Sequence, residues 1–186
     1  MRALSAVVHE ARADMVIRTS LPSDLPYIRH LGKQESFALG WIPEQIYERV
    51  WGVRFPPFTG WLLLCEVNLD PVGFCFAAPA HRPPFYGRIY QLAVQKDARR
   101  FQYGSFLADI SHRLIMKAGG NGTTLRCAAD LPANKFWQAL GWDEEQRIPV
   151  GSRVGDSPRT TKRELIQRVK RIGGFLLNAD SHQKVV

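Results

Sequence analysis

Two kinds of hydrophobic periodicity follow one another in the middle of the chain. The segment with Ile89, Leu92 and Val94 is typical of a β-strand, bounded by a glycine before it and by polar residues after it. From Tyr103 onward, apolar residues recur at the three- and four-residue spacing of one face of a helix. The members of this stripe are Tyr103, Phe106, Leu107, Ile110 and Leu114. The pattern therefore predicts a strand, a short connection and an amphipathic helix.

The same periodicities, with proline and glycine as boundary signals, predict the other elements. Helices are expected from Pro22 to Gly40, from Pro43 onward and over residues 132–142, and a hairpin turn over 68–71. Further strands are expected over residues 15–19, 61–67, 72–77, 123–128, 147–154 and 162–169. This order favours one mixed α/β (α+β) domain over residues 15–172, built on a single, mostly antiparallel sheet of six to seven strands. Residues 1–14 read as a flexible leader and residues 173–186 as a tail.

The connection between the central strand and the long helix is basic and contains a glycine. It includes Arg99, Arg100 and Gly104. The first amides of a helix lack intrahelical partners and carry partial positive charge, and a glycine lets a ligand approach the backbone closely. The segment is therefore a candidate anion site for a pyrophosphate, although a solvated basic turn would have the same composition.

Composition limits the class of protein. The chain has 186 residues, of which 45% are hydrophobic and 23% charged, as in soluble globular proteins. No apolar run is long enough to span a bilayer, so we expect a cytoplasmic protein without membrane contact. Cys65, Cys75 and Cys127 lie in apolar segments without metal-ligand spacing. They predict buried free thiols and no metal site.

The net charge of +8 is concentrated late in the chain. Residues 153–171 contain seven basic and two acidic residues, which gives this segment a charge of +5. Such a segment can bind nucleic acid or an acidic partner, and it can equally be a solvated face.

Two motifs resemble those of the GCN5-related N-acetyltransferase (GNAT) superfamily. Residues 92–104 resemble the family's central strand and its Arg/Gln-x-x-Gly-x-Gly/Ala loop, with Arg99 first, Gly104 last and Gln102 in place of the middle glycine. Residues 125–142 resemble the fifth strand and the following helix, which commonly ends in Phe-Tyr-x-x-x-Gly-Phe. The chain has Trp137 at the tyrosine position.

The resemblance implies a splayed central pair of parallel strands, with helices on both faces of the sheet and acetyl-CoA bound in the gap. It implies direct transfer of the acetyl group to an amine in a ternary complex, and a homodimer is compatible with it. The implied cofactor-binding residues are Leu92, Ala93, Val94, Arg99, Arg100, Phe101, Gln102, Tyr103, Gly104, Ser105, Asn134 and Trp137.

The residues that commonly catalyse the reaction in this family are replaced. Trp137 is not a useful acid, so a relay through Tyr90, Cys127 or water must protonate the leaving thiolate. Arg88 and Leu125 stand where the family's glutamate bases are expected. The remaining candidates each have an alternative role. The candidate catalytic residues are Glu66, which can instead face solvent, Tyr90, which can instead be a packing residue, and Asp130, which can instead cap a helix. The candidate substrate contacts are Glu35, which can instead lie on a helix surface, and Trp41, which can instead lie in the core.

A second interpretation is a degenerate acetyltransferase fold that binds nucleic acid or an acidic partner without turnover. The missing tyrosine and the basic segment 153–171 favour it, whereas the retained Arg99 and Gly104 favour the enzyme.

Overall fold

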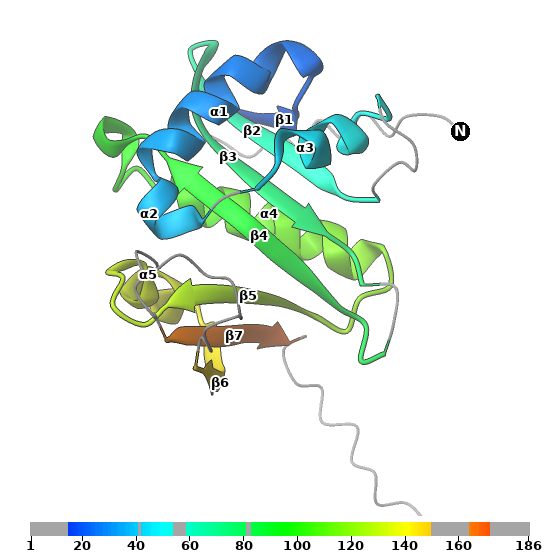
Figure 1. The fold of residues 1–186 in the computed structure, drawn as a ribbon, viewed down its shortest axis with the longest axis vertical. Helices are drawn as coiled ribbons and strands as arrows, with labels where there is room; N and C mark the ends of the chain where they lie inside the picture. Colours follow the sequence, from blue (N-terminus) through cyan, green and yellow to red (C-terminus); the bar gives the residue numbers. More distant parts are fainter. Residues whose placement is uncertain (1–14, 41, 54–58, 81–82, 150–163, 172–186) are drawn as a thin grey trace, which may run out of the picture.

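A computed structural model describes residues 15–40, 42–53, 59–80, 83–149 and 164–171. Seven strands form one sheet in the order β1-β2-β3-β4-β5-β7-β6, in which β4 and β5 are parallel and all other neighbours are antiparallel (Figure 1). The strands are β1 Met15–Thr19, β2 Trp61–Val67, β3 Asp70–Ala78, β4 Tyr86–Val94, β5 Gly122–Ala128, β6 Asp143–Ile148 and β7 Leu165–Arg171. The expected mixed, mostly antiparallel sheet with one central parallel pair is confirmed.

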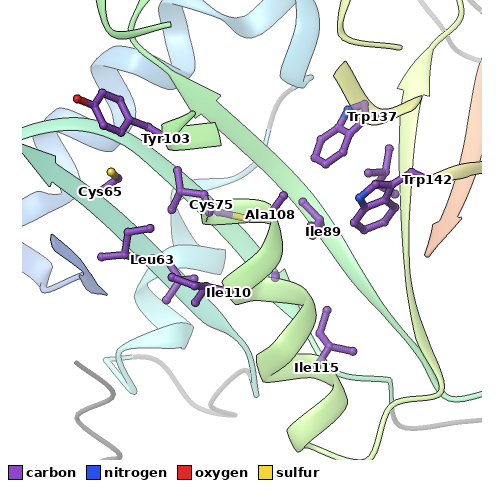
Figure 2. Close-up of a cluster of buried hydrophobic side chains, with 14 of the residues drawn as sticks. Leu63, Cys65, Cys75, Ile89, Tyr103, Ala108, Ile110, Ile115, Trp137 and Trp142 are labelled. Atoms are coloured by element: carbon purple, nitrogen blue, oxygen red, sulfur yellow. The ribbon is translucent and has the colours of Figure 1, made fainter. Parts of the chain in front are cut away.

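Helices cover both faces of this sheet, as expected. They are α1 Leu25–Gln34, α2 Ser36–Leu39, α3 Glu44–Val50, α4 Tyr103–Lys117 and α5 Ala133–Ala139, with short 3-10 helices at Pro22–Asp24 and Lys96–Ala98. The apolar stripe of α4 packs on one face of the sheet (Figure 2). Leu107 and Ile115 are fully buried there. On the opposite face, Ile28 of α1 and Tyr47 of α3 pack against Phe74 and other side chains of the sheet. Burial on both faces explains why β2 and β3 read as continuous apolar runs.

The central strands β4 and β5 form a fork. They pair only where Tyr86–Arg88 face 122–124, and beyond these three rungs they are not hydrogen-bonded to each other (Figure 1). At the paired end, a Cβ added to Gly87 would meet Ile115 of α4 at 2.4 Å. The absence of a side chain therefore lets α4 pack directly against the closed end of the fork.

A bulge accompanies this divergence. Phe76 of β3 faces Gln91, whereas the next residue, Ala77, faces Ile89, so Tyr90 is an extra residue in β4. A bulge bends the strand that carries it and increases the local twist. The bulge lies directly beyond the paired end of the fork, where β4 leaves β5.

Several boundaries differ from the sequence prediction. The β2–β3 turn is only Asn68 and Leu69, both with positive φ, because β3 already begins at Asp70. Strand β6 begins at Asp143, several residues earlier than expected. Its sequence, DEEQRI, is almost wholly exposed at the edge of the sheet, so it lacks the alternation from which a strand is predicted. No helix in the described part of the chain is long and apolar enough to cross a membrane.

Candidate active site

A cavity of about 690 Å³ lies at the open end of the fork. The end of β4, the first turn of α4, α2 and α5 form its walls. Eleven of the predicted cofactor and substrate residues line it: Glu35, Leu92, Ala93, Val94, Arg99, Arg100, Gln102, Tyr103, Gly104, Ser105 and Trp137. The fold thus brings both sequence motifs to one space, although they are separated by the whole of α4.

The first turn of α4 has the geometry of an anion site. The first helical hydrogen bond runs from the Phe106 amide to the Gln102 carbonyl, at 3.1 Å. The amides of Tyr103, Gly104 and Ser105 therefore precede the intrahelical ladder, at the positive end of the helix dipole. A Cβ on Gly104 would lie 3.4 Å from the Phe136 ring, so the glycine keeps this narrow side of the cavity open.

Two residues without a glycine's freedom hold this loop in shape. Arg100 and Gln102 have φ values of 71° and 68°, in the left-handed region. Gln102 stands where the family motif has its middle glycine, and it adopts the backbone conformation that a glycine takes readily. The departure from the motif therefore leaves at this position a backbone conformation that a glycine would also adopt.

Arg99 links this loop to the opposite wall of the cavity. Its Nε donates to the Val94 carbonyl at 3.1 Å, and its Nη2 donates to Glu35 Oε1 at 2.5 Å. Glu35 lies directly after α1 and is the only carboxylate among the described residues that line the cavity. The predicted substrate residue and the predicted phosphate residue thus form one ion pair across the cavity.

Helix α5 contributes an aromatic wall. Trp137 is buried and packs edge-to-face against Phe136, at 4.8 Å between ring centroids, and against Trp142, at 5.3 Å. Asn134, which we predicted to bind the cofactor, does not line the cavity. Its amide donates to the carbonyls of Ala128, Ala129 and Leu131, and thereby holds the turn between β5 and α5.

The three predicted catalytic residues lie outside the cavity lining. Glu66 is on β2 and binds Arg18 at 2.5 Å. Tyr90 is at the bulge of β4, where its half-exposed ring stacks on Phe76 at 5.1 Å. Asp130 is exposed in the β5–α5 turn. The N-cap of α5 is Pro132, so Asp130 lies two residues before the N-cap position.

Other predicted site residues fall elsewhere. Phe101 stacks over Tyr103, 5.9 Å between ring centroids, and does not line the cavity. Trp41 and residues 153–163 of the basic segment lie outside the described residues. Arg168 belongs to the same segment but is only 5% exposed, and it donates to the Trp142 carbonyl at 3.2 Å. The expectation that Arg168 belongs to a basic binding surface is therefore wrong, because tertiary packing encloses it.

The structure adds lining residues that the sequence did not identify. They are Gln34, Phe37, Ala38, Leu39, Ala98, Leu131, Pro132, Ala133 and Phe136. Phe37 of α2 is 70% exposed. The sequence did contain one signal for Phe37. It is an aromatic residue in the short stretch between α1 and Gly40, outside the apolar face of α1.

Comparisons with known proteins agree with this geometry. The family model described as "Acetyltransferase (GNAT) family" matches residues 27–142. A GNAT-family protein from Desulfovibrio desulfuricans has a similar structure, with a TM-score of 0.69 and 15% identity over 84% of this chain and 98% of that one. A comparison with curated proteins gave no match.

Two further structures extend the comparison. The ribosomal-protein-S18-alanine N-acetyltransferase from Escherichia coli has a TM-score of 0.64 and 16% identity, over 88% of this chain and 98% of that one. Naa50 from Arabidopsis thaliana, in complex with a bisubstrate analogue, has a TM-score of 0.61 and 15% identity, over 86% of this chain and all of that one. At these identities the likeness shows the fold. Because the family model covers more than half of the chain, this protein belongs to the acetyltransferase (GNAT) family and is an N-acetyltransferase.

Proposed function

We propose that the chain binds acetyl-CoA in the cavity at the open end of the fork and transfers the acetyl group directly to an acceptor amine in a ternary complex. The observation that carries this proposal is the cavity's position between the unpaired edge of β4 and the first turn of α4. Members of the GNAT family use acetyl-CoA, which supplies the acetyl group as a thioester.

The donor groups of the cavity suit this cofactor. The amides of Tyr103, Gly104 and Ser105, together with Arg99 and Arg100, supply positive charge for a diphosphate. The backbone of β4 beyond Arg88 is not paired with β5, and it can bind the amide groups of an extended pantetheine arm as a neighbouring strand would. Phe136 and Trp137 provide apolar contact area along the opposite wall.

The chemistry is supported by positioning more than by a dedicated base. Glu35 is the only carboxylate of the described cavity lining, and it forms an ion pair with Arg99. Holding two substrates side by side can supply several kcal/mol of the barrier reduction. Only the fraction of the acceptor amine that is already neutral in solution would then react.

This arrangement predicts a simple pH profile. We expect kcat/KM to rise with pH up to the pKa of the acceptor amine, since no group of the cavity takes its proton. Tyr90, at the bulge and outside the described cavity lining, is the candidate that returns a proton to the leaving thiolate through a relay that includes water. Tyr90→Phe should therefore lower kcat and leave the acetyl-CoA Kd unchanged. A plateau of kcat/KM reached well below the amine's pKa in steady-state kinetics would contradict the absence of a base.

Substitution at Gly104 tests the cofactor site. In Gly104→Glu, a carboxylate would enter the cavity beside Phe136 and repel a diphosphate. Calorimetric titration with acetyl-CoA should show an affinity loss of about a hundredfold or more. Gly104→Ala is the matched control, because its methyl group makes only a van der Waals contact with the Phe136 ring. Unchanged binding by a folded Gly104→Glu protein would refute the assignment of this loop.

A further inference from the structure

Two arginines occupy the same face of the sheet beside the closed end of the fork. Arg88 lies between Gly87, whose absent side chain would meet α4, and Ile89, which packs in the core beneath α4. Because side chains alternate along a strand, Arg88 points to the opposite face. Arg126 lies on that same face, because its neighbours Leu125 and Cys127 both belong to the α4 core.

The strand register brings the two side chains toward each other. Arg88 faces Thr124 in the last paired rung of the fork. Arg126 follows Thr124 by two residues, which is about 7 Å along the strand. Long arginine side chains from these two positions can therefore reach one point over the fork. The pKa of Arg88 is lowered by burial and, in addition, by the charge of Arg126, in agreement with this proximity.

The Arg88 guanidinium is partly buried without a counter-ion. Its Nε is buried and has no hydrogen-bond partner, and its Cζ lies 4.9 Å from the centroid of the Tyr90 ring. Arg126 donates from Nε to the neutral Gln167 Oε1 at 3.3 Å. Within the described part of the chain, no carboxylate pairs with either guanidinium.

Several other arginines in the described part of the chain are paired with carboxylates. Arg18 binds Asp24 and Glu66, Arg147 binds Glu144 and Glu164, and Arg171 binds Glu145. A partly buried charge without a partner is unfavourable, and a second charge of the same sign nearby adds to the cost. An anion placed between Arg88 and Arg126 would relieve both effects.

We propose that Arg88 and Arg126 bind a compact anionic group, a carboxylate or a phosphate, that the acceptor carries close to its reactive amine. This inference rests on the proposed function, since the cofactor site runs along β4 from α4 toward this closed end of the fork. The acceptor class is therefore a small amine or an amino-terminal residue with an anionic substituent. Arg88 selects it, in the place where the family commonly has a glutamate.

The test compares acceptors that differ in the anionic group, and the rates are expressed per neutral amine because this group also changes the amine's pKa. Three pairs are used: glycine and glycinamide, phosphoethanolamine and ethanolamine, and carboxamide-terminated peptides that begin with Asp or Asn. We expect the anionic member of at least one pair to have a kcat/KM about tenfold or more above its partner, through KM. The pair that shows the preference identifies the source of the anion: the carboxylate of an amino acid, a phosphate, or the side chain of a peptide's first residue.

Variants then assign the effect to the two arginines. Arg88→Gln and Arg126→Gln should each remove the preference for the anionic acceptor and leave the neutral acceptors unaffected. Lys117→Gln, at the exposed end of α4, makes the same change in net charge and should behave as wild type. Acetyl-CoA affinity should be unchanged in all three. Equal rates for anionic and neutral acceptors, with acetyl-CoA bound, would overturn this inference and leave the proposed function standing.

A binding measurement decides the case in which no acceptor of the panel reacts. Succinate and inorganic phosphate are titrated into the acetyl-CoA-bound protein at constant ionic strength, and thermal unfolding is recorded. We expect at least one of them to raise the Tm of the wild type and not that of Arg88→Gln. Without anion, Arg88→Gln should be at least as stable as the wild type. No shift with either anion would overturn the anion site, whereas loss of acetyl-CoA binding itself would overturn the proposed function.

Discussion

At the scale of single residues, the cavity loop depends on backbone conformations that its side chains disfavour. Arg100 and Gln102 both adopt positive φ within three residues, directly before α4. The left-handed region costs a residue with a Cβ roughly 1–2 kcal/mol relative to the right-handed one. The loop keeps this geometry because the helix and the cavity wall on either side fix its ends.

Replacing Gln102 by glycine should therefore stabilise the protein. We expect Gln102→Gly to raise the free energy of unfolding by about 0.5–1 kcal/mol, since the relief of strain exceeds the added freedom of the unfolded chain. Urea denaturation measures this change. Gln138→Gly, in helix α5, is the matched control and should destabilise by about 1 kcal/mol. If Gln102→Gly were as destabilising as Gln138→Gly, the left-handed conformation of Gln102 would not be a source of strain.

His112 of α4 is a half-buried group whose titration we expect to affect stability. Its Nδ1 lies 2.8 Å from Thr123 Oγ1, and its ring packs edge-on against Trp142. Burial, and then the nearby charge of Lys170, lower the pKa of His112, while Asp109 acts in the opposite direction. A histidine whose pKa is lowered by folding stabilises the native state above its unfolded pKa, and this contribution is lost as the pH falls.

Stability should accordingly decrease below about pH 6.5, the ordinary histidine pKa. His112→Gln, which can still bond to Thr123, should reduce the difference in unfolding free energy between pH 7.5 and pH 5.5. Urea denaturation at the two values measures it. His30→Gln, at an exposed position of α1, serves as control. The prediction fails if both variants keep the full pH dependence of the wild type.

At the scale of elements, the ion pair between Arg99 and Glu35 joins the phosphate loop to the α1–α2 junction. Both side chains are partly exposed, so the pair itself adds little stability. Its effect on ligand binding is larger, because Glu35 brings a negative charge to a cavity proposed to hold a diphosphate. We therefore expect cofactor binding and the position of α2 to be coupled through Arg99.

Removing this carboxylate should strengthen cofactor binding. We expect Glu35→Gln to lower the acetyl-CoA Kd by about threefold, since Arg99 is released and a like charge is removed. Acetyl-pantetheine, which lacks the diphosphate, should bind both proteins equally. Glu44→Gln on α3, which breaks the exposed pair with Arg29, is the matched control. Weaker acetyl-CoA binding by Glu35→Gln would mean that the ion pair organises the site and does not compete with it.

At the scale of the whole molecule, the sheet separates two hydrophobic clusters, and all three cysteines are buried. Cys75 Sγ accepts a hydrogen bond from Ser111 Oγ, at 3.1 Å, where α4 packs on β3. Burial raises the pKa of Cys75 and of Cys65 to about 12. A thiol with so high a pKa and no solvent contact does not react until the structure around it opens.

Thiol labelling should therefore report the unfolding of the whole domain. At pH 8 without denaturant, we expect a disulfide reagent such as dithionitrobenzoate to react with none of the three cysteines at an appreciable rate, and with all of them in concentrated urea. The variant Lys117→Cys adds an exposed thiol at the end of α4. The reagent should react at once with this thiol and with no other. Fast labelling of one native cysteine would show that its part of the sheet opens separately.

Most of the architecture can be predicted from the sequence. The change from strand to helical periodicity at Tyr103 and the glycine and proline boundaries predicted the element order, and the resemblance of the two motifs to the GNAT family implied the fork. These features are local, because a strand, a helix or a turn is set by the spacing of residues within it. The start of the polar edge strand β6 was not predicted, because its residues do not alternate between polar and apolar.

The contacts between distant side chains follow from the tertiary structure alone. Glu35 and Arg99 are 64 positions apart, Arg168 is enclosed by packing against the end of α5, and a bulge sets the direction of Tyr90. Burial and pairing depend on segments distant in sequence, whose approach no local pattern records. For the same reason, only the arrangement of β4 and β5 in the sheet shows that Arg88 has no carboxylate partner within the described part of the chain.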